Sequence, residues 1–134
     1  MGVTRNLWGN FPKTPEGTLP RNILNKQRDY LDEAMEGELI SEINHYKEKG
    51  KVKFCLSVYP FESDELQTDI VSVTHSINIY PASLKNGVTG EDPWHAEDEG
   101  AFIKHLERIL SSPDVMNTIN RFRLIAAAHK NSNT

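Results

Sequence analysis

The stretch that decides the fold is Leu-Gln-Thr-Asp-Ile-Val-Ser-Val-Thr-His-Ser-Ile-Asn-Ile-Tyr-Pro, residues 66–81. From Val71 to Ile79 the odd positions are Val, Val, His, Ile and Ile, and the even positions are Ser, Thr, Ser and Asn. A period of two is typical of a strand with one buried face. We therefore expect a half-buried strand here, with His75 as the one polar residue in its apolar row.

Two further strands are expected before this one. Residues 52–59 alternate clearly, with Val52, Phe54, Leu56 and Val58 on one face. Residues 38–46 allow two interpretations, because their apolar residues fit either a strand or a continuation of the preceding helix past a glycine at position 37. We favour a hairpin closed by the loop 47–51, which gives an antiparallel meander of three strands.

Helical periodicity occurs on both sides of the strands. Pro20 suits the first turn of a helix whose apolar residues recur at spacings of three and four. A second helix is expected from Ala96, after a turn-rich loop that follows Pro81. Its stripe is Ala101, Phe102, His105, Leu106, Ile109 and Leu110. Ser112-Pro113-Asp114 predicts the start of a third helix, whose stripe is Val115, Ile119, Phe122 and Ala126.

These patterns predict a single α+β domain over residues 1–134, with one helix before the three-stranded sheet and two after it. The helices are expected to pack on the face that bears Val71, Val73, Ile77 and Ile79. Residues 1–19 are expected to form an extended arm whose aromatic side chains, Trp8 and Phe11, either fold back on their own domain, which is the favoured interpretation, or contact a second subunit. Residues 131–134 are expected to be a frayed tail.

Composition limits the classes of function. Hydrophobic residues make up 37% of the 134 residues and charged residues 25%, which is typical of a globular domain with one core. The single cysteine, Cys55, excludes an internal disulfide, and no apolar run is long enough for a signal peptide or a membrane span. We therefore expect a cytoplasmic protein with no membrane association.

His75 heads the candidate ligand-binding residues. An imidazole on a buried strand face must either find hydrogen-bond partners or lose its charge. A pocket beside it would be completed by Tyr80 near the end of the strand, Trp94 near the end of the following loop and His105 on the second helix. A histidine satisfied within the core is the favoured alternative, because no catalytic partner is tied to His75 by spacing.

Other reactive side chains have ordinary explanations. The carboxylates of Glu97, Asp98 and Glu99, which follow His95, suit the start of a helix better than a metal site. Cys55 beside Lys53 is interpreted as an inert strand residue. Common nucleotide-binding, metalloprotease and hydrolase motifs do not occur in the sequence. We predict no catalytic residue, no metal and no cofactor.

Two groups of basic residues are candidates for contact with nucleic acid. Four lysines alternate along residues 47–53, interrupted by Glu48, and Arg121, Arg123 and Lys130 lie on the last helix. The net charge of −4 and the lack of aromatic residues among the lysines argue against this function.

Several segments together resemble small uncharacterised bacterial proteins of the kind carried on mobile gene cassettes. They are the proline-rich start, the helix near residues 23–27, the segment 72–81 and the segment Leu-Glu-Arg-Ile-Leu-Ser-Ser at 106–112. The resemblance implies an α+β fold and a bacterial cytoplasm, and it assigns no site.

Three hypotheses of function follow. The first is a non-enzymatic binding or interaction module that forms a homodimer, with Trp8 and Phe11 at the interface between the copies. The alternative is a small enzyme or small-molecule-binding protein with its pocket beside His75. A second alternative is nucleic-acid binding through Lys47–Lys53 and Arg121/Arg123.

Overall fold

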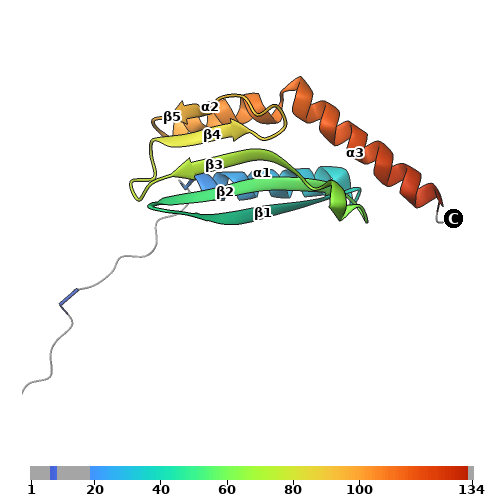
Figure 1. Cartoon of the computed structure of the whole chain (residues 1–134), viewed down its shortest axis with the longest axis horizontal. Coiled ribbons are helices and arrows are strands. Elements are labelled where there is room, and N and C mark those ends of the chain that lie inside the picture. Colours follow the sequence, from blue (N-terminus) through green and yellow to red (C-terminus); the bar gives the residue numbers. More distant parts are fainter. Residues whose placement is uncertain (1–6, 9–18, 133–134) are drawn as a thin grey trace, which may run out of the picture.

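The computed structural model describes residues 7–8 and 19–132, and within them it contains three α-helices, a short 3₁₀ turn and five strands. In chain order these are α1 (Pro20–Met35), β1 (Leu39–Glu48), β2 (Lys51–Pro60), η1 (Asp64–Leu66), β3 (Thr68–His75), β4 (Ala82–Asn86), β5 (Trp94–Ala96), α2 (Glu99–Leu110) and α3 (Pro113–Ser132). The strands pair in sequence order in one antiparallel sheet (Figure 1).

The α+β class and the three predicted helices are confirmed, but the prediction of three strands is wrong because the sheet has five. The additional strands, β4 and β5, lie in the segment that was expected to be a loop. Only Leu84 in β4 is a large apolar residue, and β5 is three residues long, so neither has a clear alternating pattern. They become strands because β3 offers an unpaired edge and β4 then offers a second one.

The predicted strand at residues 66–81 ends earlier than its alternation suggests. β3 stops at His75, which pairs with Ala82 at the start of β4. The chain reverses between these two residues, and Ile79 there has a positive φ of 73°. Ile77 is 93% exposed. The prediction that Ile77 and Ile79 share the helix-covered face with Val71 and Val73 is therefore wrong, although both valines are fully buried.

The hairpin interpretation of residues 38–46 is confirmed. β1 pairs with β2 along its whole length, from Leu39 opposite Pro60 to Glu48 opposite Lys51. Helix α1 cannot continue into this segment because Glu36 adopts the left-handed conformation at its C-cap and Gly37 follows with φ of 85°.

A β-bulge shapes the centre of the sheet. The pairing of β2 with β3 shifts between Leu56 and Ser57, so Ile70 is an extra residue on β3. The bulge allows Ile70 and Val71, although consecutive in sequence, both to be buried. Gly87, which follows β4, donates its backbone N–H to the carbonyl oxygen of Ile70 at 2.9 Å. The end of β4 is thereby attached to the bulge.

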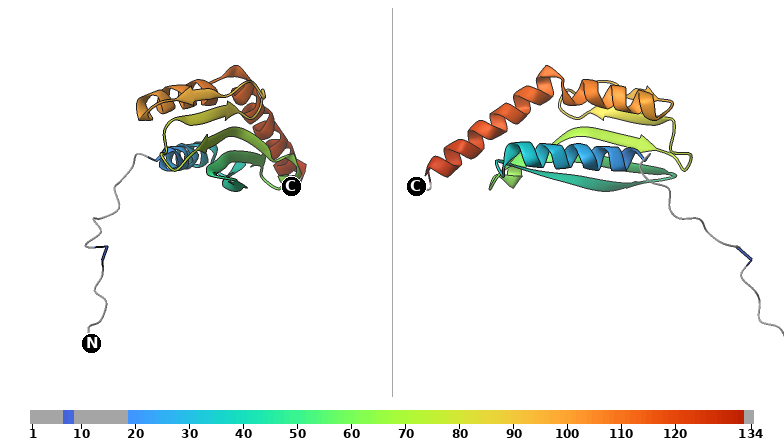
Figure 2. Two further views of the ribbon diagram at one scale, coloured as in Figure 1. Left: turned by 60° about the vertical axis from the view of Figure 1, so that its left-hand side comes forward. Right: turned by 180° about the vertical axis from the view of Figure 1, so that it is seen from behind.

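Helices α1 and α2 cover the same face of the sheet. The strands lie in front of both helices in Figure 1, and the helices lie in front of the strands when the molecule is seen from behind in Figure 2. Helix α3 leaves the end of α2 at an angle and packs against β2 and β1. Two contacts hold it there, Arg123 to Glu38 at 2.8 Å and His129 to Glu62 at 2.5 Å.

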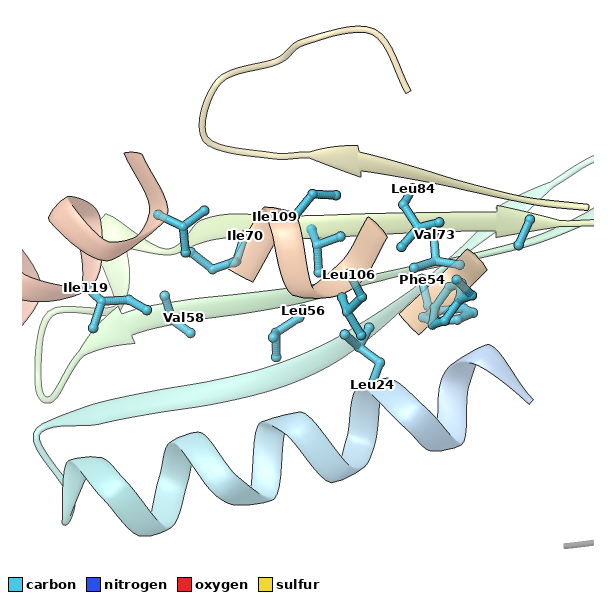
Figure 3. Packing of buried hydrophobic residues seen from close by; sticks show 14 of the residues in the cluster. Leu24, Phe54, Leu56, Val58, Ile70, Val73, Leu84, Leu106, Ile109 and Ile119 are labelled. Carbon is cyan, nitrogen blue, oxygen red and sulfur yellow. The ribbon is translucent and has the colours of Figure 1, made fainter. Parts of the chain in front are cut away.

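One hydrophobic core lies between the sheet and the three helices. Figure 3 shows Leu24 of α1 and Leu106 of α2 among side chains from β2 and β3. The fully buried residues Phe54, Val58 and Val73 come from the central strands. Of the segments expected to be irregular, residues 1–6, 9–18 and 133–134 lie outside the described part of the chain, whereas Asn131 and Ser132 belong to α3.

Candidate functional site

The structure brings together two of the four predicted ligand-binding residues. The rings of Trp94 on β5 and His105 on α2 lie with their centroids 4.9 Å apart. The guanidinium of Arg108, one turn further along α2, lies 5.3 Å from the centre of the Trp94 ring. The Nδ1 atom of His105 is buried and has no hydrogen-bond partner in the described structure. This cluster attaches α2 to the edge strand β5.

His75 and Tyr80 have separate surroundings. The Nδ1–H of His75 donates to the backbone carbonyl oxygen of Ser76 at 2.8 Å, and its ring lies edge-on to Phe54 at 6.1 Å. Tyr80 packs against the core. Burial raises the pKa of Tyr80, and the carboxylates of Glu99 and Asp98 raise it further. These contacts explain both residues as structural, and a ligand-binding role for them stays a prediction.

A groove lies between α1 and α2 and is lined mainly by residues of these two helices. Its volume is about 760 Å³, within the range of pockets that hold small molecules or peptide side chains. Met116, in the first turns of α3, also lines it. The lining residues are Asn22, Ile23, Lys26, Gln27, Ile103, Leu106, Glu107, Leu110, Ser111 and Met116.

The groove combines apolar walls with a polar rim. Leu106 is part of the buried core, while Ile103 and Met116 are each 46% exposed. Lys26 and Glu107 supply one charge of each sign at the rim. A surface with this composition can hold an apolar group and select its orientation through a few polar contacts.

Sequence reasoning did not identify the groove, although a signal was present. Ile103 and Met116 fall outside the apolar stripes of their helices, so their side chains are large apolar groups on the side expected to face water. A large apolar residue next to the core-facing stripe makes the apolar face of a helix wider than packing against the core requires. The extra apolar surface is then available to a ligand or a partner.

The opposite face of the sheet carries a polar network. The fully buried Ser57 donates from Oγ to Asp69 Oδ1 at 2.6 Å and accepts from Asn44 Nδ2 at 3.1 Å. In a serine that is activated for acyl transfer, a histidine imidazole accepts the proton of the hydroxyl. Here the two partners of the Ser57 hydroxyl are the side chains of Asn44 and Asp69. The network therefore explains how a hydroxyl is satisfied in the middle of the sheet, and it has the chemistry of a structural site.

Cys55 lies on the same face as this network and is 2% exposed. Burial raises the pKa of its thiol from 9.0 to about 11, and the nearby Asp69 contributes to the rise while Lys53 opposes it. The prediction of an inert cysteine agrees with this environment, because the thiolate is the reactive species.

The thiol of Cys55 is expected to react slowly with Ellman's reagent in the native protein. At pH 8 a thiol with a pKa of about 11 holds roughly a hundredfold less thiolate than one with the ordinary value of 9.0. We therefore expect native Cys55 to react at least about 100-fold more slowly than Cys55 in urea. Equal rates in the two conditions would contradict the assigned environment.

The two basic areas lie far apart. The lysines at positions 47, 49, 51 and 53 surround a hollow of about 410 Å³ at the tip of the β1–β2 hairpin. Arg123 instead pairs with Glu38, just before the other end of β1. Ten residues of strand separate these points by roughly 30 Å. They do not form one continuous surface for a nucleic-acid backbone.

The predicted acidic helix start is confirmed. Asp98 is the N-cap of α2, and its carboxylate accepts from the backbone N–H of Ala101 at 2.8 Å. Within residues 7–8 and 19–132, no group of three or more His, Cys, Asp or Glu residues is arranged to hold a metal ion. In the same part of the chain, no helix has the length and apolar character needed to cross a membrane.

Comparisons of this chain with protein-family models, with curated proteins and with solved structures found no match. The resemblance to proteins of mobile gene cassettes therefore stays a prediction.

Proposed function

We propose that this chain is a non-enzymatic interaction module that binds an apolar segment of a protein partner in the groove between α1 and α2. The observation that carries the proposal is the groove itself, about 760 Å³ in volume, with exposed Ile103 and Met116 in its walls. Exposed apolar surface surrounded by polar residues is typical of a protein-binding site. A cytoplasmic location, in a bacterial cell, is part of this proposal.

The geometry favours the groove as the binding site over a pocket beside His75 and over a nucleic-acid-binding surface. A pocket beside His75 would need converging polar groups, but its Nδ1–H is used by the carbonyl oxygen of Ser76 and its ring lies against Phe54. Nucleic-acid binding would need one extended basic surface, and the lysine hairpin and Arg123 lie at opposite ends of β1.

Ile103→Glu is expected to abolish binding of an apolar probe. The probe is 1-anilinonaphthalene-8-sulfonate, whose rings suit the apolar walls and whose sulfonate suits Lys26 at the rim. A carboxylate at position 103 would put a charge into the wall of the groove, and burying it is unfavourable. We expect the dye affinity, measured by fluorescence titration at 1 μM protein, to fall at least about tenfold.

Leu124→Glu is the matched control. Leu124 is an apolar residue on α3, 71% exposed, and it does not line the groove. The control variant should bind the dye as the unmodified protein does, and circular dichroism should show that both variants fold. Equal dye affinity in the Ile103 and Leu124 variants would contradict the proposal.

A further inference from the structure

We infer that the segment which fills the groove is the N-terminal arm, residues 1–19, of a second copy of this chain, so that two copies exchange arms. This inference rests on the proposed function, because it names the partner of the same groove. Each copy then supplies one arm and one groove, and the two contacts are related by a two-fold axis.

The arm offers the apolar side chains that the groove can accept. Leu7 and Trp8 are 77% and 80% exposed in the single chain. The sequence of the arm adds Phe11, three residues after Trp8. Tryptophan is enriched at the energetically dominant positions of protein interfaces, because its ring buries a large apolar area and loses little conformational entropy. The apolar side chains in the sequence of this segment and the apolar walls of the groove thus have matching chemistry on one molecule.

The position of the arm also fits exchange between copies. Asn22 and Ile23, in the first turn of α1, line the groove, so the arm joins the domain beside it. Trp8 precedes Leu19 by eleven residues, a reach of at most about 38 Å. The groove wall from Ile103 to Leu110 is about 10 Å long. An arm can therefore span the groove of a second domain that sits alongside.

Charge favours the same pairing. The arm carries Arg5 and Lys13 against the single acid Glu16, whereas the whole chain has a net charge of −4. The basic arm and the acidic domain therefore attract each other, which steers two copies together.

The surface involved is large enough for a stable dimer. A tryptophan and a phenylalanine each bury roughly 150–250 Å², so Trp8 and Phe11 from two arms hide roughly 600–1,000 Å². The groove surfaces that they cover about double this value, and the resulting total of roughly 1,200–2,000 Å² is the size of a specific interface.

Light scattering coupled to size exclusion tests the inference on full-length protein. The unmodified chain should be a dimer at tens of micromolar. Trp8→Ala and Ile103→Glu should each raise the dissociation constant of the dimer at least about thirtyfold, as expected for loss of a dominant contact. Leu124→Glu should leave it unchanged. A mixture of the Trp8 and Ile103 variants should recover a weaker heterodimer, because one arm and one groove remain intact between them.

The outcomes separate this inference from the proposed function. A monomeric unmodified protein, or a dimer that Trp8→Ala does not weaken, overturns the inference of arm exchange. If Trp8→Ala still binds anilinonaphthalene sulfonate in that case, the groove remains a binding site for another partner. If Trp8→Ala is folded and binds no dye, the proposed function fails, and the inference fails with it.

Discussion

Replacing Phe54 with alanine is expected to lower the free energy of unfolding by about 3–5 kcal/mol. Phe54 is fully buried on β2, the second strand of the sheet, between the rings of His45 and His75 at 6.2 and 6.1 Å. The helices cover only one face of the sheet, so a cavity at this position weakens the single core directly. Urea denaturation monitored by circular dichroism measures the change.

Phe61→Ala is the matched control for this substitution. Phe61 directly follows β2, and its side chain is 49% exposed. Its backbone N–H donates to the carbonyl oxygen of Glu38, and this hydrogen bond does not depend on the side chain at position 61. We expect a loss of less than about 1 kcal/mol. Similar losses for the two variants would show that Phe54 is not the centre of the core.

Gly87→Ala is expected to destabilise the protein by about 1–3 kcal/mol or more. A Cβ atom at position 87 would lie 2.2 Å from the backbone oxygen of Asp69 and 2.7 Å from its carbonyl carbon. Backbone cannot move aside as a flexible side chain can, and this segment is fixed by the Gly87 N–H bond to Ile70. The substitution therefore forces β4 away from the bulge in β3.

Gly100→Ala should change stability in the opposite direction. Gly100 lies in the first turn of α2, and an added Cβ would meet only the Asp98 carboxylate at an ordinary 3.5 Å. Alanine stabilises a helix by up to about 1 kcal/mol relative to glycine. Thermal unfolding of the two variants should give a lower midpoint for position 87 and a higher one for position 100. A neutral Gly87→Ala would contradict the close approach to Asp69.

Part of the fold could be predicted because its signals are local. The alternation of Phe54, Leu56 and Val58 and that of Val71 and Val73 correctly gave the covered face of two strands, whereas Val52 at the start of the first pattern is 45% exposed. The Ser112-Pro113 pair located the start of α3 because a cap and a proline act within one turn. The end of β3 was predicted wrongly because Ile77 and Ile79 continue the alternation beyond the point where the chain turns toward β4.

The candidate site depended on contacts between distant segments. Trp94 and His105 were named together and do touch, whereas His75 and Tyr80 are occupied elsewhere. Leu106 and Leu110 had been assigned to the apolar stripe of the second helix, and each also lines the groove. Periodicity gives the face on which such a residue lies, but it does not give the distance between two helices.

The sequence by itself determined the α+β class, the three helices and the covered face of residues 54–58 and 71–73, because these follow from spacings within one segment. It favoured the long hairpin over a continued helix, and the structure decided between the two. Only the tertiary structure decided that Ala82–Asn86 and Trp94–Ala96 are strands, since their pairing depends on the backbone edge that a neighbouring strand presents. It also decided that α1 and α2 lie side by side with a groove between them. The separation of two helices is set by packing on a shared sheet, which no single segment encodes.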